Sequence, residues 1–150
     1  MREILFRGKR IDNGEWVEGY LYEHEPPLVG IVPENYVPEP SKWFIVRTAF
    51  ADWNLQRQVE FVEVSTSTVC QFTGLTDKNG KRIFEGDIVR CGTGMICKVT
   101  FFISPGVSGF DLVPVGGFNS PSPHNWSLFY DTEIIGNIHD NHELLNKTRR

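Results

Sequence analysis

MICKVTFFI, residues 95–103, is the stretch that decides the fold. Its odd-numbered positions are all apolar, whereas Lys98 and Thr100 stand between them. An apolar period of two predicts a β-strand that turns one face to a core. Residues 87–91 predict a second strand, and Gly92-Thr93-Gly94 predicts a turn between the two. We therefore expect an antiparallel strand pair in this part of the chain.

More strands are predicted towards the start of the chain. Residues 4–6 and 16–21 are rich in apolar and aromatic side chains, and Asp12-Asn13-Gly14 lies between them. Asn-Gly tolerates the positive φ values that a tight turn needs, so this segment predicts a β-hairpin. Residues 43–50 and 58–64 predict two further strands because β-branched and aromatic side chains dominate them.

Residues 23–40 interrupt this pattern, because they hold five of the chain's nine prolines. Proline lacks a backbone donor and cannot sit in a central strand, so the segment predicts a long loop. A change of composition at residues 65–68 predicts a boundary. We expect an N-terminal β unit with a Pro-rich loop at residues 1–64 and a second unit at 65–150. Short strands at this spacing are typical of an all-β barrel or sandwich.

Charge and cysteine content narrow the class of protein. The net charge of −4 gives no overall cationic field that would attract a polyanion. No apolar run approaches the roughly 18–20 residues that span a bilayer, so we expect no membrane association. Cys70, Cys91 and Cys97 are an odd number without CxxC spacing, which favours reduced thiols. Together these features predict a cytoplasmic protein.

Three segments resemble a known family when taken in order. They are REILFRG at residues 2–8, QFTGLTDKNGKRIFEGDIV at residues 71–89 and IGNIHDN at residues 135–141. Together they are similar to the YopX family of bacteriophage and prophage proteins. The resemblance implies a small β-rich accessory protein, encoded by a phage or prophage and located in the cytoplasm of a bacterial host. It also implies an SH3-like small barrel in the C-terminal part, with the N-terminal β-hairpin unit packed against it.

The central segment also has an interpretation from its residues alone. Asp77-Lys78-Asn79-Gly80 predicts a turn, because Asn and Gly accept left-handed backbone conformations. Glu85-Gly86-Asp87 predicts a second turn that leads into a strand. The polar residues of this segment are therefore expected to shape the backbone. The alternative is a binding surface built on Lys78, Lys81 and Arg82.

Two arrangements of acids and bases suggest metal chemistry. His139 and His142 at a spacing of three, with Asp140 and Glu143 nearby, would bring imidazoles and carboxylates together on a helix. A second set, with the spacing of no known motif, would suit a divalent-ion nuclease. Its members are Lys81, Glu85, Asp87 and Asp140. Solvated side chains and turn residues explain both sets more simply, so we assign no metal site and no cofactor.

Nucleophilic catalysis by a thiol is disfavoured as well. Cys97 lies on the apolar face of its predicted strand, where burial disfavours the thiolate. Cys70 and Cys91 have no histidine close to them in the sequence. Small core residues are the simpler interpretation of all three. We therefore assign no catalytic residue, although an enzymatic role stays open.

The aromatic residues of the N-terminal half allow two interpretations. Trp43, Phe44, Phe50 and Trp53 could stack the bases of single-stranded nucleic acid. Few basic residues accompany them, so packing in the core is the preferred interpretation. The sequence thus predicts a non-enzymatic binding or interaction module whose partner is an unknown host or phage protein, or a second copy through an unpaired edge strand. A nucleic-acid-binding protein and a metal-dependent enzyme are the alternatives.

Overall fold

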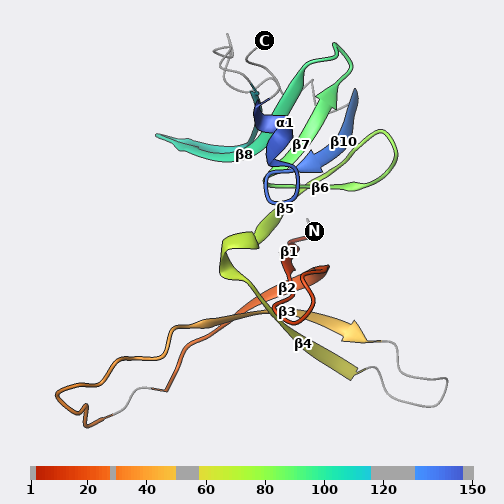
Figure 1. Cartoon of the computed structure of the whole chain (residues 1–150). Coiled ribbons are helices and arrows are strands. Elements are labelled where there is room, and N and C mark those ends of the chain that lie inside the picture. The colour runs from red at the N-terminus through yellow and green to blue at the C-terminus, as the bar shows by residue number, and fades with distance from the viewer. Residues whose placement is uncertain (1–2, 28–29, 50–57, 116–130, 147–150) are drawn as a thin grey trace. The chain divides into compact units, whose positions relative to one another are not determined.

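The computed structural model describes residues 3–27, 30–49, 58–115 and 131–146 (Figure 1). In these ranges the chain consists of β-strands, one short 3-10 helix and one short α-helix, which confirms the all-β class. The chain divides into two compact units. The first unit is Leu5–Val69, and the second unit is Cys70–Arg150 together with Met1–Ile4. No helix in the described ranges combines the length and the apolar character that a bilayer crossing requires.

The first unit is an antiparallel sheet in which the strand order is β4-β3-β2-β1. Its elements are β1 (Phe6–Lys9), β2 (Trp16–His24), β3 (Lys42–Ala49), β4 (Gln58–Val64) and the 3-10 helix η1 (Thr66–Thr68). β1 and β2 form the predicted hairpin. In its turn Arg10 N donates to Glu15 O at 2.9 Å, and Gly14 has a φ of 73°. The Asn-Gly signal therefore identified this turn correctly.

One side of this sheet carries the core of the first unit. Val17, Ile45, Val62 and Val64 are buried together there. They come from three neighbouring strands, and each lies at the strand position that alternation turns to the same side. The connection from β2 to β3 follows an irregular path (Figure 1), and its described residues contain no strand, as the prolines predict.

The second unit contains a hairpin and a sheet. Its elements are β5 (Cys70–Thr76), β6 (Arg82–Phe84), β7 (Asp87–Cys91), β8 (Ile96–Ser104), β9 (Val107–Pro114), β10 (Thr132–Asn137) and α1 (His142–Asn146). β5 and β6 pair with each other, whereas the sheet has the order β10-β7-β8-β9. All of these pairings are antiparallel. The predicted pair at residues 87–103 is confirmed as β7 and β8.

The alternation that defines β8 does not mark a core face along its whole length. Cys97 and Val99 are buried in a cluster with residues of β7 and β9. Phe101 is partly exposed, and Ile103 has 81% of its surface exposed. The reason is that the β8–β9 hairpin is longer than β7. The described pairing between β7 and β8 ends at Lys98, whereas β8 and β9 stay paired as far as Ser104. The period of two thus identified the strand but overestimated its buried part.

The predicted SH3-like small barrel is not confirmed. In the described part of the second unit, the sheet is open and begins with β10 and ends with β9. β9 pairs with β8 alone among the described strands, so the ladder does not close. Short strands separated by turns are shared by barrels and open sheets, and closure depends on pairings between distant strands. Composition and spacing therefore predict the class but not the closure.

Candidate binding site

The other side of the first unit's sheet carries exposed aromatic side chains. Residues opposite each other in an antiparallel ladder share a side of the sheet. Tyr22 lies opposite Phe44, and Tyr20 lies opposite Val46. Val46 in turn lies opposite Phe61 of β4. We call this surface the aromatic face; its members are Tyr20, Tyr22, Phe44, Val46, Val59 and Phe61.

The rings of the aromatic face contact one another across three strands. The Tyr22 ring lies 6.3 Å from that of Phe44 and 6.0 Å from that of Phe61, the latter edge to face. The Tyr22 hydroxyl also lies 3.2 Å from Nδ1 of His24. Nevertheless, Tyr20 is 63% exposed and Phe61 is 57% exposed. A cluster of exposed apolar groups of this kind is typical of a surface that binds a partner.

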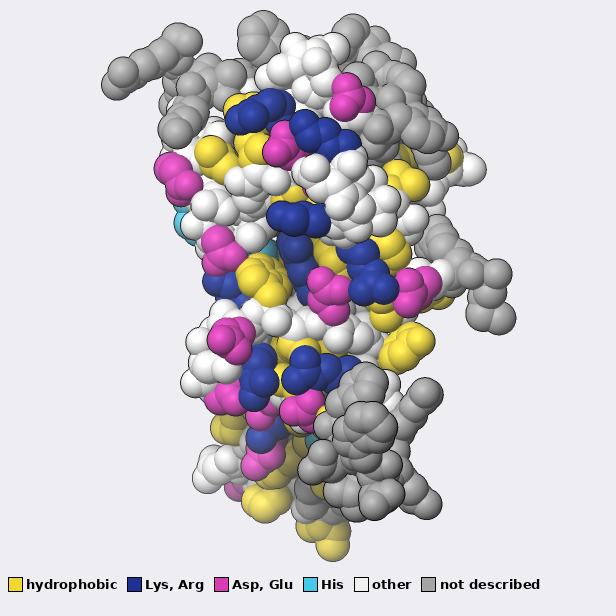
Figure 2. All heavy atoms as spheres, turned by 90° about the vertical axis from the view of Figure 1, so that its right-hand side faces the viewer, with side chains coloured by type: hydrophobic (Ala, Val, Ile, Leu, Met, Phe, Trp, Pro, Cys, Tyr) yellow, Lys and Arg dark blue, Asp and Glu magenta, His cyan; other side chains and the backbone are white. Residues whose placement is uncertain are grey.

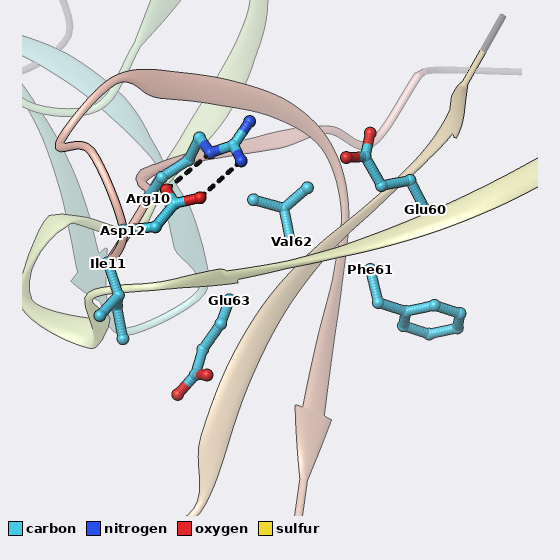
Figure 3. Close-up of a pocket in the computed structure, with 7 residues that line it drawn as sticks. All are labelled: Arg10, Ile11, Asp12, Glu60, Phe61, Val62 and Glu63. Atoms are coloured by element: carbon cyan, nitrogen blue, oxygen red, sulfur yellow. Dashed lines mark hydrogen bonds and ion pairs between the residues drawn. The ribbon is translucent and has the colours of Figure 1, made fainter.

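A small hollow lies beside the aromatic face, along the edge of β4. It has a volume of about 230 Å³ and is bounded by the β1–β2 turn and by β4 (Figure 3). We call it the edge hollow; its lining residues are Arg10, Ile11, Asp12, Glu60, Phe61, Val62 and Glu63. In Figure 3, Glu60 and Val62 project to one side of β4, whereas Phe61 and Glu63 project to the other. The hollow and the aromatic face therefore share Phe61.

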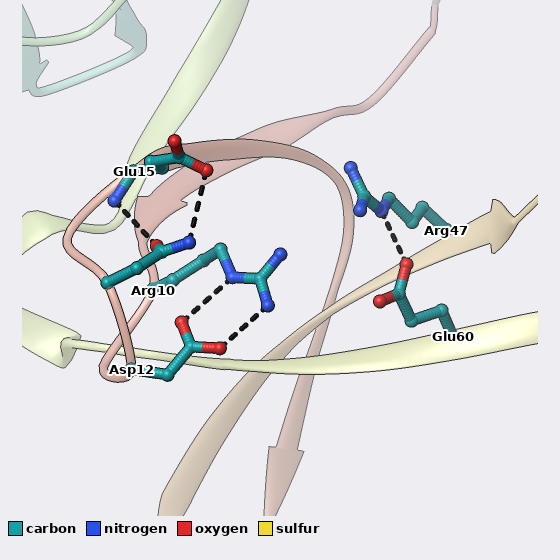
Figure 4. Close-up of polar contacts among 6 residues, drawn as sticks. Arg10, Asp12, Glu15, Arg47 and Glu60 are labelled. Carbon is teal, nitrogen blue, oxygen red and sulfur yellow. Dashed lines mark hydrogen bonds and ion pairs between the residues drawn. The ribbon is translucent and has the colours of Figure 1, made fainter.

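Two ion pairs set the charge of the edge hollow (Figure 4). Arg10 donates through Nε and Nη2 to both carboxylate oxygens of Asp12, at 2.9 and 2.7 Å. These bonds raise the pKa of Arg10 and lower the pKa of Asp12. Arg47 donates to Glu60 at 2.8 Å. Glu63 makes no ion pair with any described residue, so it adds a carboxylate that no described guanidinium neutralises.

The three predicted binding residues lie in and after the β5–β6 turn, and acids accompany two of them. Lys78 Nζ lies 2.7 Å from Glu133, which raises the pKa of Lys78. Arg82 lies 3.5 Å from Glu3 and over the ring of Phe72. On the face drawn in Figure 2, Lys and Arg side chains likewise alternate with Asp and Glu. Binding through Lys78, Lys81 and Arg82 remains a prediction.

The conspicuous acids of the central segment bond to the backbone. Asp77 accepts the N–H groups of Asn79 and Lys81, both at 2.9 Å, and that of Ile134 at 3.1 Å. Burial opposes its ionisation, but these three bonds outweigh burial and lower the pKa of Asp77. Asp87 is buried, and it accepts the N–H of Phe84 at 2.8 Å. Both acids therefore shape turns, as the residue pattern predicts.

The histidines and acids named as a metal set do not converge. The Nε2 atom of His139 lies close to the Sγ atom of Cys70, and His142 is exposed on α1. Asp140 accepts from Asn137 at 2.9 Å. Among the described residues there is no group of three or more His, Cys, Asp and Glu side chains that could hold a metal ion.

One contact between a cysteine and a histidine was missed by the sequence analysis. Cys70 Sγ lies 3.6 Å from Nε2 of His139, although the two are 69 positions apart. Cys70 is only 4% exposed, so a substrate cannot reach its sulfur without local opening. Cys97 is buried as expected, and burial raises its pKa to about 12. Cys91 is buried as well, so all three thiols are shielded from solvent in the folded chain.

The aromatic residues singled out from the sequence separate onto different surfaces. Trp43 packs against the core cluster of the first unit. Phe44 lies on the aromatic face, one position further along β3. Phe50 and Trp53 lie outside the described residues. Tyr20, Tyr22 and Phe61 could not be grouped from the sequence, because only the register of β2, β3 and β4 brings them together.

Comparisons with known proteins identify the family and the fold of this chain. The sequence model of the YopX protein family matches residues 41–146. The chain belongs to the YopX family, which confirms the resemblance. No curated protein matches the chain. Among solved structures, protein EF1440 from Enterococcus faecalis is similar, with 19% sequence identity, a TM-score of 0.53 and coverage of 97% of this chain and 99% of that one. This similarity shows the fold alone.

Proposed function

We propose that this chain is a non-enzymatic interaction module, an accessory protein encoded by a phage or prophage that acts in the cytoplasm of its bacterial host. Its aromatic face binds a partner protein. The observation that carries this proposal is the exposure of the Tyr20, Tyr22 and Phe61 rings, with Tyr22 touching both the half-buried Phe44 and Phe61. Covering such a surface removes apolar area from water, which stabilises a complex by about 25 cal/mol per Å² before the costs of association.

A protein partner fits this surface better than a small substrate does. The aromatic face belongs to a pleated sheet, in which His24 lies beside Tyr22 and Glu63 lies opposite Phe44. Aromatic anchors such as tyrosine are enriched in protein interfaces because they bury a large area with few rotatable bonds. The side chains between them, Val46 and Val59, add aliphatic area to the same surface.

Single-stranded nucleic acid is the main competitor for an aromatic sheet. It needs basic groups that follow the phosphates beside the stacking rings. At the β1 side of the sheet, the Arg7 guanidinium and the Lys9 ammonium lie over the Trp16 ring, at 4.6 and 5.5 Å from its centre. Around Tyr22 the same side of the sheet carries Val46 together with a basic residue, Lys42, which lies opposite His24. The aliphatic and aromatic area there favours a protein partner.

The proposal can be tested by site-specific photo-crosslinking in the bacterial host. Benzoylphenylalanine replaces Phe61 on the aromatic face or, as the control, Ile103, which is exposed in the second unit. We expect a discrete protein adduct from position 61, absent from position 103. Adding Tyr22→Ser to the position-61 variant should reduce the adduct, because Tyr22 contacts that ring. Thermal melting of each variant checks that the fold is retained.

Two outcomes would overturn the proposal. If position 61 gives no more adduct than position 103, the aromatic face does not bind a protein. If the adduct disappears after nuclease treatment, the occupant is a nucleic acid. An adduct that persists after nuclease treatment and weakens with Tyr22→Ser supports the proposal.

A further inference from the structure

The proposed function leaves open the form in which the partner meets the first unit. We infer that the free edge of β4 receives an extended segment of the partner, which adds as a strand beside Val59 and Phe61 and places a Lys or Arg side chain at the edge hollow. This inference rests on the proposed function and names the chemistry of its partner.

The backbone of β4 shows which groups are available. In an antiparallel ladder, alternate residues direct their N–H and C=O to the same side. Ile11 N donates to Glu63 O at 3.1 Å, and Ser65 N donates to Lys9 O at 2.9 Å. Positions 63 and 65 therefore point away from β3. Counting back in steps of two, Phe61 and Val59 point their backbone groups in the same outward direction.

These outward groups lie on an open edge. β4 ends the strand order of its unit, and the isolated bridge between Arg10 and Val64 is its only pairing on the outer side among the described residues. The β1–β2 turn thus covers the edge at positions 63–65 and leaves Val59 and Phe61 uncovered by described strands. An open edge is a template for an added strand, because its N–H and C=O groups match those of an extended chain.

The charge at the edge hollow selects the side chain that the added strand carries. Asp12, Glu60 and Glu63 line the hollow. Arg10 neutralises the first, and Arg47 neutralises the second. Glu63 is left with a negative charge two positions from Phe61. A Lys or Arg side chain on the incoming segment would lie opposite or diagonal to these positions and would meet that charge.

A second copy of this chain fits the same edge poorly. Symmetric pairing of two β4 edges through Val59 and Phe61 places Glu60 of one copy opposite Glu60 of the other. Like charges directly opposite each other destabilise a sheet, and the exposed ion pair of each Glu60 with Arg47 offsets only part of this repulsion. Shifting the register to centre on Phe61 places Val59 of one copy opposite the partner copy's position 63, which Ile11 already covers. The edge therefore favours a different, basic chain.

The inference is tested by selecting random heptapeptides displayed on phage against the full chain. We expect enriched peptides in which apolar residues alternate with Lys or Arg. Val59→Pro should weaken the binding of these peptides by about tenfold. Proline removes the outward N–H of position 59, and its ring occupies the place where the added strand would pair. The ladder to β3 keeps its bonds, since position 59 directs its backbone groups outward. Glu63→Gln should weaken the same peptides by about threefold.

Controls separate the edge from the rest of the unit. Thermal melting verifies the fold of Val59→Pro. If Val59→Pro unfolds, the weaker peptide binding expected of Glu63→Gln still tests the inference. Failure to enrich basic peptides, or equal binding by both variants and the parent chain, would overturn the inference. So would a dimer in sedimentation analysis that Val59→Pro converts to a monomer. If peptide binding fails while the crosslink at position 61 persists, the proposed function stands and the edge inference falls.

Discussion

Asp77 accepts the backbone N–H of Ile134 through its Oδ2 atom at 3.1 Å, across 57 positions of sequence. Its Oδ1 atom accepts two N–H groups of its own turn, those of Asn79 and Lys81. One carboxylate thus forms the β5–β6 turn and ties it to β10. The residue pattern predicts the first role of Asp77, whereas the second depends on the tertiary fold.

Replacing Asp77 should therefore destabilise the second unit. Asp77→Ala leaves three N–H groups without their acceptor, and we expect the free energy of unfolding to fall by about 2–4 kcal/mol. Urea denaturation followed by circular dichroism measures this change. Asp12→Asn is the matched control, because Asp12 is an exposed acid in another turn and its loss should change stability little. Equal losses in the two variants would contradict the structural role of Asp77.

Acidification should lower the stability of the folded protein, because protonation of Asp77 weakens the same bonds. The pKa of Asp77 is lowered from its ordinary value of 3.8, so the folded protein holds the carboxylate more readily than the unfolded chain does. Its stabilising contribution is complete above pH 3.8 and declines as the pH falls through the lower folded value. We expect the parent chain to lose more stability than Asp77→Asn between pH 5 and pH 2. Parallel stability curves for the two proteins would argue against this.

The buried thiols should resist alkylation. The Sγ atoms of Cys91 and Cys97 lie 3.8 Å apart, and burial raises the pKa of both, that of Cys97 to about 12. At pH 8 both remain protonated and covered, so brief iodoacetamide treatment should leave them unmodified until the protein unfolds. Peptide mass spectrometry measures the labelling, with Ser108→Cys as an exposed positive control. Rapid labelling of Cys97 in the folded protein would contradict its burial.

Gly19 should tolerate no side chain. A Cβ atom at this position in β2 would press on the backbone oxygen of Val46 and on the side chain of Ile45. Because a backbone oxygen in a ladder cannot move aside easily, Gly19→Ala should destabilise the first unit by about 1–3 kcal/mol. Gly30→Ala is the control, since a Cβ atom there meets nothing within 4 Å. Thermal melting compares the variants, and equal melting temperatures would refute the crowding at position 19.

The two sides of the first unit's sheet should respond differently to truncation. Ile45 is fully buried, so Ile45→Ala should reduce the free energy of unfolding by about 2–4 kcal/mol. Tyr20→Ala removes a larger but exposed side chain, and its effect should stay within about 0.5 kcal/mol. Chemical denaturation measures both. A large loss with Tyr20→Ala would mean that the aromatic face is covered within the folded chain.

The strands could be predicted from the sequence because each depends on local pattern. The alternation over residues 95–103 located β8, and Asn13-Gly14 located the first hairpin turn. The buried extent of β8 could not be predicted, because burial of Ile103 depends on whether β7 reaches it. The prediction of a closed barrel failed for a similar reason, since closure depends on pairings between strands that are distant in the sequence.

The candidate site was less predictable than the fold. Trp43 and Phe44 are neighbours in sequence but lie on opposite sides of β3, and only the register shows which one faces the core. A long connection separates β2 from β3, so no tight turn fixes that register in the sequence. The contact between Cys70 and His139 could not be predicted either, because the two residues are far apart in the sequence. Residue types alone identified the turn-forming acids, because their partners within the turns, Asn79, Lys81 and Phe84, are close in the chain.

The bonds of Asp77 have a consequence for evolution. All three of its partners are main-chain N–H groups, which every amino acid except proline supplies. Lineages descended from one ancestor can therefore exchange the side chains at Asn79 and Lys81 while the carboxylate of Asp77 stays fixed, whereas the side chain of Ile134 also packs against the core. Selection can alter the chemistry that this turn displays without rebuilding the scaffold beneath it.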